Sequence, residues 1–199
     1  MTASPYALSC CMKELREKDE YTYIHSLHVA RLTNIFCSLL KVSKKETREI
    51  TTAAILHDIG KINVPLHILQ GNSKLTEEEW TIMKNHAIFS IEYLKDRNFN
   101  DSILKNILCH HERISGTGYP NQLKENEIPF GAKIIAIADS LDAMLTNRSY
   151  RRKLSFEQAK EEIAKNAGIM YDNKMVQVIL NNWNVVENYY SCDFVKNHV

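Results

Sequence analysis

The chain has 199 residues, enough for one domain of ordinary size with a short extension. Apolar residues make up 44% of it, which allows a sizeable core, yet no apolar run reaches the roughly 18 residues that a membrane span needs. The net charge of +1 provides no general attraction to DNA or to an acidic membrane, so an anionic ligand must be recognised by local charges.

The ends of the chain and its cysteines indicate where the protein works. Segment 1–18 lacks the basic start and long apolar stretch of a signal peptide, and the five cysteines, without CxxC spacing, are typical of reduced thiols. We therefore expect a cytoplasmic protein with a helical extension over 1–18, a main domain over 19–185 and a C-terminal tail over 186–199. We expect residues 187–199 to be loosely held.

Apolar residues recur at helical spacing along most of the chain, with no convincing strand pair and no repeat. One face of a long amphipathic helix runs over residues 25–40. Ser43, with Glu46 three residues on, has the spacing of a helix N-terminus. It predicts a helix that passes His57 and ends near Gly60.

Two later segments also begin with the spacing of a capping box. Thr76 with Glu79 predicts a helix that contains His86, and Ser155 with Gln158 predicts another.

Three further helices complete the predicted set, over residues 103–112, 132–145 and 174–183, with a Gly/Pro loop over 115–120 between the first two. The expected fold class is all-α, a helical bundle.

His57 and Asp58 are adjacent at the polar end of the apolar segment 53–56. A buried carboxylate beside a buried imidazole is costly unless something pairs with both, and a metal ion would do so. Further candidate ligands are His25, His86, His110, His111 and Asp139. These seven residues offer enough nitrogen and oxygen donors for two metal ions that share one carboxylate. Ligands spread over several helices suit a site in the core of a bundle.

Other prominent side chains have an ordinary structural interpretation. A single histidine on a helix face is more often a satisfied core or surface residue, and we interpret His28, His67 and His198 in this way. Trp80 and Trp183 are interpreted as core packing rather than ligand stacking.

Two motifs resemble those of a known family. Residues 57–61 (His-Asp-Ile-Gly-Lys) resemble the signature of the HD phosphohydrolase superfamily. Residues 110–113 (His-His-Glu-Arg) and 116–120 (Gly-Thr-Gly-Tyr-Pro) resemble its HD-GYP branch, and shorter matches follow the family order over residues 19–180. The resemblance implies an HD-domain helical bundle with a dinuclear metal site in its core, and a catalytic domain over 19–185.

The resemblance also implies how two divalent metal ions divide the ligands. One ion is held by His25, His57, Asp58 and Asp139, and the other by Asp58, His86, His110 and His111, so that Asp58 bridges the pair. A donor set of nitrogen and oxygen with open positions suits iron or manganese. Tyr21 stands where some members carry a Glu that binds a third metal, so we expect two.

HD-GYP proteins are cyclic dinucleotide phosphodiesterases, typically of cyclic di-GMP. The resemblance implies hydrolysis of cyclic di-GMP, or of a relative such as cyclic GMP-AMP, to linear pGpG, with further cleavage to GMP left open. The nucleophile would be a hydroxide that bridges the metals. Two alternatives stay open: a catalytically weak or inactive module that binds cyclic dinucleotides in signalling, and a different HD-superfamily phosphohydrolase.

Spacing and resemblance together give roles beside the metals. Asp58, Lys61 and Asp142 are expected at the catalytic site, with Lys61 steadying a phosphate oxygen and Asp142 orienting Lys61 through a charge-assisted hydrogen bond. The expected substrate-binding residues are Lys61, Gly118, Tyr119, Pro120, Arg148 and Arg151.

Two residues depart from the family pattern. Ser115 replaces an Asp and Ser149 replaces a Pro, and neither change removes a metal ligand. The expected partners are the cyclic dinucleotide and, as an open possibility, a diguanylate cyclase or other signalling protein. A homodimer is left open, and neither DNA nor a membrane span is expected.

Overall fold

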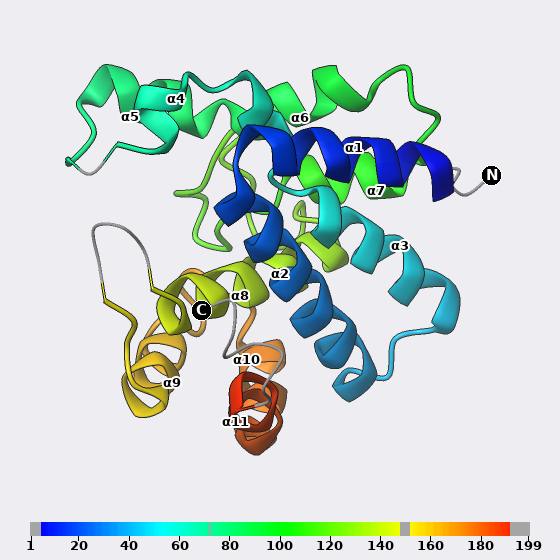
Figure 1. Ribbon diagram of the computed structural model, residues 1–199. Coiled ribbons are helices and arrows are strands. Elements are labelled where there is room, and N and C mark those ends of the chain that lie inside the picture. Colours follow the sequence, from blue (N-terminus) through cyan, green and yellow to red (C-terminus); the bar gives the residue numbers. More distant parts are fainter. Residues whose placement is uncertain (1–4, 72, 148–151, 192–199) are drawn as a thin grey trace.

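The computed structural model describes residues 5–71, 73–147 and 152–191, and within these ranges it contains helices and no strands (Figure 1). The helices are α1 (Pro5–Lys18), α2 (Glu20–Leu39), α3 (Lys44–Leu56), the 3₁₀ helix η1 (Ile59–Asn63), α4 (Leu66–Leu69), α5 (Glu77–Lys84), α6 (His86–Leu94), α7 (Asp101–Leu108), α8 (Phe130–Leu145), α9 (Phe156–Lys165), α10 (Asn173–Asn181) and α11 (Trp183–Ser191). The all-α prediction is confirmed.

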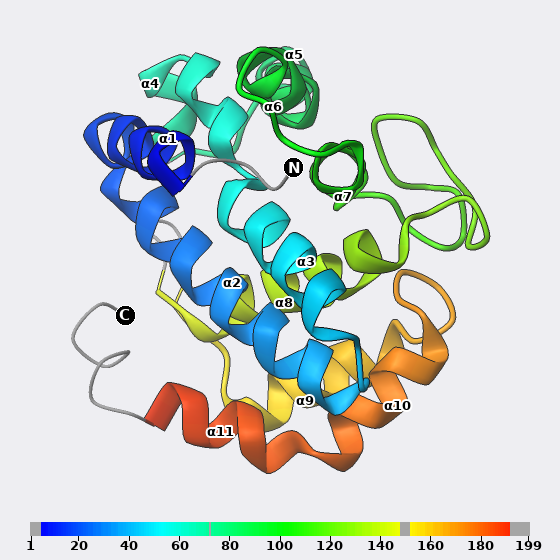
Figure 2. The same cartoon turned by 90° about the vertical axis from the view of Figure 1, so that its right-hand side faces the viewer.

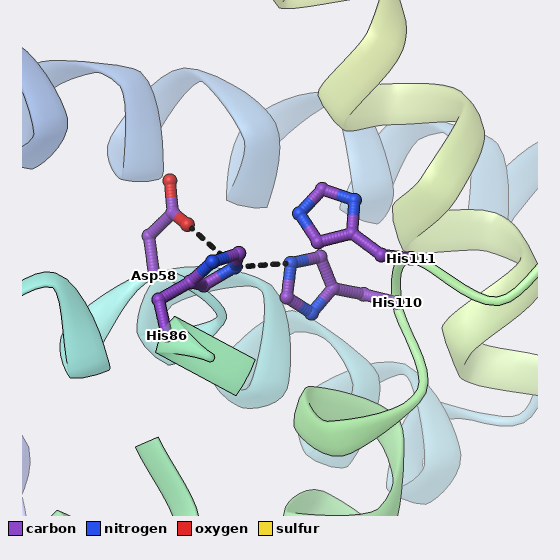
Figure 3. A group of neighbouring side chains, drawn as sticks. All are labelled: Asp58, His86, His110 and His111. Carbon is purple, nitrogen blue, oxygen red and sulfur yellow. Dashed lines mark hydrogen bonds and ion pairs between the residues drawn. The ribbon is translucent and has the colours of Figure 1, made fainter. Parts of the chain in front are cut away.

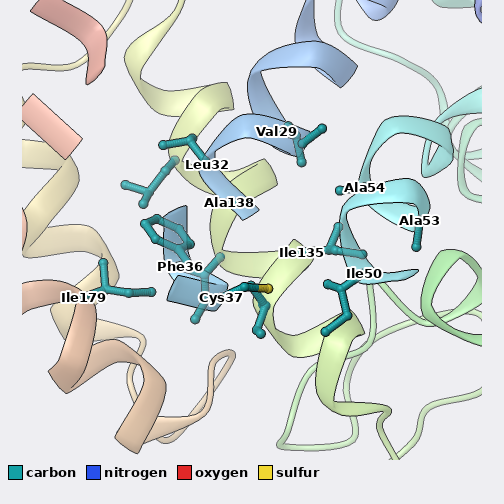
Figure 4. Packing of buried hydrophobic residues seen from close by; sticks show 14 of the residues in the cluster. Val29, Leu32, Phe36, Cys37, Ile50, Ala53, Ala54, Ile135, Ala138 and Ile179 are labelled. Atoms are coloured by element: carbon teal, nitrogen blue, oxygen red, sulfur yellow. The ribbon is translucent and has the colours of Figure 1, made fainter. Parts of the chain in front are cut away.

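Helices α2, α3 and α8 form the centre of the molecule, and α1 crosses one end of them (Figures 1 and 2). Figure 4 shows Leu32 and Phe36 of α2 in one buried cluster with Ile135 of α8, which lies toward Ile50 of α3 in this view. The side chains of Leu32, Phe36 and Ile135 are fully buried. Burying an aliphatic or aromatic side chain of this size contributes about 1.5–3 kcal/mol. This packing fixes the helices that carry the candidate ligands.

Local capping signals set the starts of several helices as expected. The Ser43 hydroxyl accepts a hydrogen bond from the Glu46 backbone at the start of α3. Complete capping boxes begin α5 and α9, each formed by a hydroxyl residue and the side chain three residues later. The sequence signals for these helix starts are confirmed.

The histidine-bearing segments end or break their helices earlier than predicted. Helix α3 ends at Leu56 and α7 at Leu108, so the two His-containing motifs lie just beyond helix ends. The predicted helix from Thr76 breaks at Asn85, and His86 becomes the first residue of α6. The prediction of continuous helices through these histidines is therefore wrong.

The C-terminal region is more ordered than predicted. Residues 187–191 extend α11, in which Tyr189 and Tyr190 are buried, so the expectation of a loosely held segment is wrong for these residues. Trp183 at the start of α11 is also buried, which confirms its interpretation as core packing. Among the helices described, none combines the length and apolar character that crossing a bilayer requires.

Candidate metal centre

The seven predicted ligands come from distant parts of the chain and gather in the core. Each has a donor atom within 4.8 Å of those of other members, in three overlapping groups. The residues lie in α2 (His25), in the turn between α3 and η1 (His57, Asp58), at the start of α6 (His86), after α7 (His110, His111) and in α8 (Asp139). Their assignment as ligands stays a prediction, but the structure places them together.

The first group joins Asp58, His86, His110 and His111 (Figure 3). The Nε2 atom of His86 lies 3.3 Å from Asp58 Oδ1 and 3.3 Å from His110 Nε2. This group is the complete set expected for one metal ion.

The second group joins His25, His57 and Asp58, and a third brings Asp139 to His57. Asp58 Oδ2 lies 3.3 Å from His57 Nε2 and 3.7 Å from His25 Nε2. His25 Nε2 is also 3.0 Å from Asp139 Oδ1. Asp58 belongs to both of the first two groups, the position a bridging carboxylate requires.

Three of the imidazoles are held in the same way. In His57, His86 and His110, Nδ1 lies 2.8, 2.7 and 2.6 Å from the backbone carbonyl oxygen three residues earlier. A carbonyl only accepts, so Nδ1 carries the hydrogen and Nε2 is left as the donor atom for a metal. The last carbonyls of a helix lack intrahelical partners, and ligands placed just past a helix end satisfy them.

The residues present fit a metal ion. His57 Nε2 and Asp58 Oδ1 are buried and have no hydrogen-bond partner, although buried polar atoms are normally satisfied. Both atoms are Lewis bases and both lie inside the ligand groups. A divalent cation would complete their coordination.

The electrostatics favour the metal-binding protonation states. Burial lowers the pKa of His86 to about 4, and burial together with the neighbouring His86 lowers that of His111 to about 3. The pKa of Asp58 lies well below its ordinary value: burial opposes ionisation, but the Lys61 charge and the surrounding imidazoles outweigh it. At neutral pH these groups are a carboxylate and neutral imidazoles, the forms that bind metal.

His25 differs because two carboxylates flank it. Burial alone would lower its pKa, but hydrogen bonds to Asp139 and Asp142 and their charges raise it to about 9. Without metal, the proton on His25 offsets the carboxylates. A divalent cation would supply that positive charge and bind the deprotonated ring.

The predicted Lys61–Asp142 hydrogen bond is wrong. Lys61 lies in the 3₁₀ turn after Asp58 and donates to Asp58 Oδ2 at 2.6 Å. Asp142 instead bonds His25, with its Oδ2 2.6 Å from Nδ1. Lys61 therefore borders the centre directly, whereas Asp142 supports one of its histidines from behind.

His28 is a member of this arrangement that sequence reasoning missed. It is buried, and its Nδ1 lies 3.1 Å from Asp142 Oδ1. Its position three residues after His25, on the same face of α2, was the available signal. The interpretation of His28 as a satisfied core histidine is confirmed, and what the sequence did not show is that its partner is the Asp142 that also bonds His25.

The Gly-Tyr-Pro segment borders the centre on its outer side. The Tyr119 ring lies 4.7 Å from the His111 ring, and its backbone N–H donates to the His111 carbonyl at 3.3 Å. The buried Glu112 carboxylate accepts from the backbone N–H groups of Asn121 and Leu123 at 2.6 and 2.9 Å. Glu112, which was given no role from the sequence, thus folds the segment holding Gly118, Tyr119 and Pro120 back toward the His doublet.

Trp80 lies beside this segment. Its side chain is 44% exposed and its ring is 6.5 Å from that of Tyr119 in an edge-on arrangement, so the prediction that Trp80 packs in the core is wrong. Arg148 and Arg151, the other expected substrate-binding residues, lie outside the described residues, as does Ser149.

A cavity of about 380 Å³ adjoins the centre at His25. It is lined by residues including Tyr21, His25, His28, Asp142 and Asn147. The centre is thus buried but has open space next to it.

The fold and the cluster define an all-α protein with a candidate metal centre in its core. A family model described as "HD domain" matches residues 9–175. The chain belongs to the HD domain family.

Curated relatives show the same similarity. The chain is 39% identical over 167 residues to a cyclic di-GMP phosphodiesterase of Thermotoga maritima, an alignment that covers 82% of this chain and 45% of the relative. It is 35% identical over 164 residues to the 3'3'-cGAMP-specific phosphodiesterase 2 of Vibrio cholerae, covering 81% of this chain and 31% of the relative. The chain therefore spans less than half the length of these relatives.

Solved structures share the fold. The HD domain of the Listeria monocytogenes phosphodiesterase PgpH, in complex with cyclic-di-AMP, matches with a TM-score of 0.68 and 18% identity, covering 92% of this chain and 97% of that one. The cyclic GMP-AMP-specific phosphodiesterase V-cGAP3 of V. cholerae matches with a TM-score of 0.68 and 16% identity, covering 94% of this chain and 51% of that one.

Proposed function

We propose that this protein is a metal-dependent phosphodiesterase that hydrolyses cyclic di-GMP, or a relative such as cyclic GMP-AMP, to the linear dinucleotide. The observation that carries the proposal is the place of Asp58 in two histidine groups at once, which suits a pair of metal ions on one carboxylate. The names of the relatives, phosphodiesterases of cyclic di-GMP and of 3'3'-cGAMP, support the substrate class.

The proposed metal ligands are the seven residues of the cluster, divided as the family resemblance implies. Iron or manganese is the proposed metal, because the donors found among the described residues are imidazole nitrogens and carboxylate oxygens. When bound, two such ions would lower the pKa of a water that serves as nucleophile and would offset negative charge on the phosphate. The protein then needs no nucleophile of its own.

Lys61 has the placement of a phosphate-binding group. Its ammonium is partly exposed while the Asp58 carboxylate beside it is buried, so the positive charge lies on the accessible side of the pair. An ammonium there attracts and steadies a phosphate oxygen. Lys61 also lowers the pKa of Asp58 and so keeps the bridging carboxylate ionised.

The aromatic pair of Trp80 and Tyr119 has the placement of a base-binding surface. Tyr119 contacts His111, and the exposed Trp80 extends the aromatic surface outward. Purine bases stack on such rings. On the family resemblance, Arg148 and Arg151 are proposed to contact the phosphates.

An anaerobic assay tests the proposal. Purified protein is stripped, reloaded with Fe(II) or Mn(II), and incubated with cyclic di-GMP or cyclic GMP-AMP, with products separated by chromatography and metal counted on the same sample. We expect a linear dinucleotide and about two metal ions per chain. Two ions with no product would favour the alternative, a module that binds cyclic dinucleotides without turnover. A chain that binds no metal would contradict the seven-ligand centre.

A further inference from the structure

A chain of hydrogen bonds leads from the last described helix to the candidate metal centre. The Tyr190 hydroxyl of α11 donates to Asp142 Oδ1 at 2.7 Å. Asp142 Oδ2 lies 2.6 Å from His25 Nδ1, and the opposite nitrogen of that ring, Nε2, faces Asp139 Oδ1 at 3.0 Å. Tyr190 is thus two hydrogen bonds away from the atom with which His25 would bind metal.

The three residues that this chain of hydrogen bonds joins, Tyr190, Asp142 and His25, are all buried. Asp142 is 1%, His25 3% and Tyr190 8% exposed. A buried carboxylate is stable only when hydrogen-bond donors surround it, and Asp142 has three: His25, His28 and Tyr190. The His28 and Tyr190 bonds both reach Oδ1, which leaves Oδ2 to His25. Hydrogen bonds in such a low-dielectric setting fix geometry firmly.

The packing around Tyr190 restricts its movement. Its ring meets His28 edge-on at 6.5 Å and lies 6.4 Å from the ring of Phe156 in α9. Trp183 and Val186, which precede Tyr190 in α11, are also buried. The match to the HD domain family model ends at residue 175, so this helix contributes from beyond the matched region.

We propose that Tyr190 is a positioning residue for the metal centre, acting through Asp142 on His25. The inference rests on the proposed metal centre. By fixing the Asp142 carboxylate, the hydroxyl sets the tautomer and orientation of the His25 ring, the task of the groups that hold metal-binding histidines from behind. Because linkage is reciprocal, metal at His25 and docking of α11 stabilise each other.

Because the ligands divide into two sets, loss of the Tyr190 hydroxyl should lower metal affinity at one site only. His25 belongs to the set proposed for one ion, whereas the other set comprises Asp58, His86, His110 and His111. Loss of the Tyr190 hydroxyl therefore weakens one site and spares the other. A merely structural role for Tyr190 would weaken both sites together or neither.

The first test is the variant Tyr190→Phe in the full chain, titrated with Mn(II) against a chelator and followed by electron paramagnetic resonance. We expect the affinity of one site to fall about tenfold, the lower end of the range for groups behind a metal ligand, with the other site unchanged. The matched control is Tyr189→Phe, which removes the neighbouring hydroxyl of α11 and leaves the Tyr190–Asp142 bond in place. Equal Mn(II) affinities in Tyr190→Phe and the wild type would overturn the inference.

A double-mutant cycle separates action through Asp142 from other effects. In an Asp142→Asn background, Tyr190→Phe is expected to cause no further loss of Mn(II) affinity. The reason is that the Asp142 carboxylate, through which Tyr190 acts on His25, is already altered. Additive losses would contradict the proposed route.

A measurement on the wild type keeps the inference testable whether or not the variants fold. Hydrogen exchange of α11 amides is compared with and without Mn(II), and we expect slower exchange with the metal bound. Identical exchange in a chain that binds two ions would overturn this inference while leaving the proposed function intact. A wild type that binds no Mn(II) would overturn the metal centre itself, and this inference with it.

Discussion

At the scale of single residues, Asp58 is the point on which the charges of the centre converge. One carboxylate oxygen lies 2.6 Å from Lys61 Nζ and 3.3 Å from His57 Nε2, and the other lies 3.3 Å from His86 Nε2. Among the residues that the structure describes, only Asp58 belongs to both the His25 group and the His86 group.

Removing this carboxylate should therefore affect both ions. We expect Asp58→Ala to abolish metal binding at both sites together with turnover, measured as metal content by mass spectrometry and as linear dinucleotide produced. Asp96→Ala, which removes an exposed carboxylate elsewhere, is the control and should retain both. A variant of Asp58 that still holds two ions would disprove the bridging assignment.

Trp80 shows how a residue of ordinary appearance gains a functional interpretation from its surroundings. In the sequence it fits the apolar pattern of a helix face, and only the structure reveals that it is 44% exposed beside Tyr119. Periodicity shows which face a residue occupies, but not whether another element covers that face.

A substitution tests whether Trp80 stacks on a base. We expect Trp80→Ala to raise the KM for the cyclic dinucleotide about 5- to 150-fold, since stacking of a base on an aromatic ring contributes about 1–3 kcal/mol. Steady-state kinetics should show little change in kcat, and Trp80→Phe should restore much of the affinity. Unchanged KM in Trp80→Ala would remove the base-binding role.

At the scale of elements, five of the seven candidate ligands lie at or just beyond helix ends, and only His25 and Asp139 lie inside helices. The sequence predicted α2, α8 and the starts of α3, α5 and α9 well, because apolar spacing and capping residues are local signals. It did not predict that helices stop just before His57, His86 and the His doublet. Each stop depends on a ring nitrogen bonding a terminal carbonyl and on ligands that come from other helices, which no local window contains.

The same limit explains the error in the partner predicted for Asp142. The sequence placed Asp142 one helical turn after Asp139, and in the structure it lies beside His25 of the candidate metal centre. Its partners come from α2 and α11, more than 100 residues before it in one case and 48 residues after it in the other. The position of Asp142 on its helix could not show whether its carboxylate would bond these residues or Lys61.

The contact between η1 and α6 is a second element-scale feature, and it depends on Gly60. A Cβ atom at Gly60 would lie 2.0 Å from the His86 carbonyl oxygen and 2.4 Å from the Ser90 backbone nitrogen. The backbone N–H of Gly60 donates to the Ser90 hydroxyl at 2.9 Å, which closes the contact. The two elements meet backbone to backbone.

Gly60→Ala should therefore force α6 away from the His-Asp turn. We expect a loss of at least about 3 kcal/mol in the free energy of unfolding, the upper end of the range for overpacking, measured by urea denaturation of the metal-free protein. Gly168→Ala is the matched control: nothing lies within 4 Å of its Cβ, and only its φ of +76° opposes the change. That control should lose about 1–2 kcal/mol. Equal losses in the two variants would show that η1 and α6 adjust freely.

At the scale of the whole molecule, the near-neutral net charge conceals a strongly charged core. The sequence carries 25 basic and 24 acidic residues, yet Asp58 and Asp142 lie at the centre of the bundle with only 1% of their surface exposed. Composition could not show this, because it does not separate buried charges from surface charges. The pKa values of His25, His86 and His111 are consequently shifted far from the ordinary value, and the stability of the metal-free protein must depend on pH.

The directions of these pKa shifts predict a pH at which the metal-free protein is most stable. The pKa of His25 is raised to about 9. Its contribution to the free energy of unfolding is therefore complete below pH 6.5 and is lost as the pH rises toward 9. The pKa values of His86 and His111 are lowered to about 4 and 3, so their contributions are complete above pH 6.5 and are lost as the pH falls toward 4 and below. Asp142, with a pKa lowered to about 2, adds a loss only below pH 4.

We therefore expect the Tm of the metal-free protein, followed by circular dichroism, to be highest near pH 6.5 and to fall on both sides. Metal loading should change the two sides differently. On the alkaline side a cation replaces the His25 proton, so the fall between pH 6.5 and 9 should disappear. On the acid side protons compete with the metal for the imidazoles, so the fall should become steeper. A metal-free protein whose Tm still rises from pH 6.5 to 9 would show that the His25 proton does not offset the buried carboxylates.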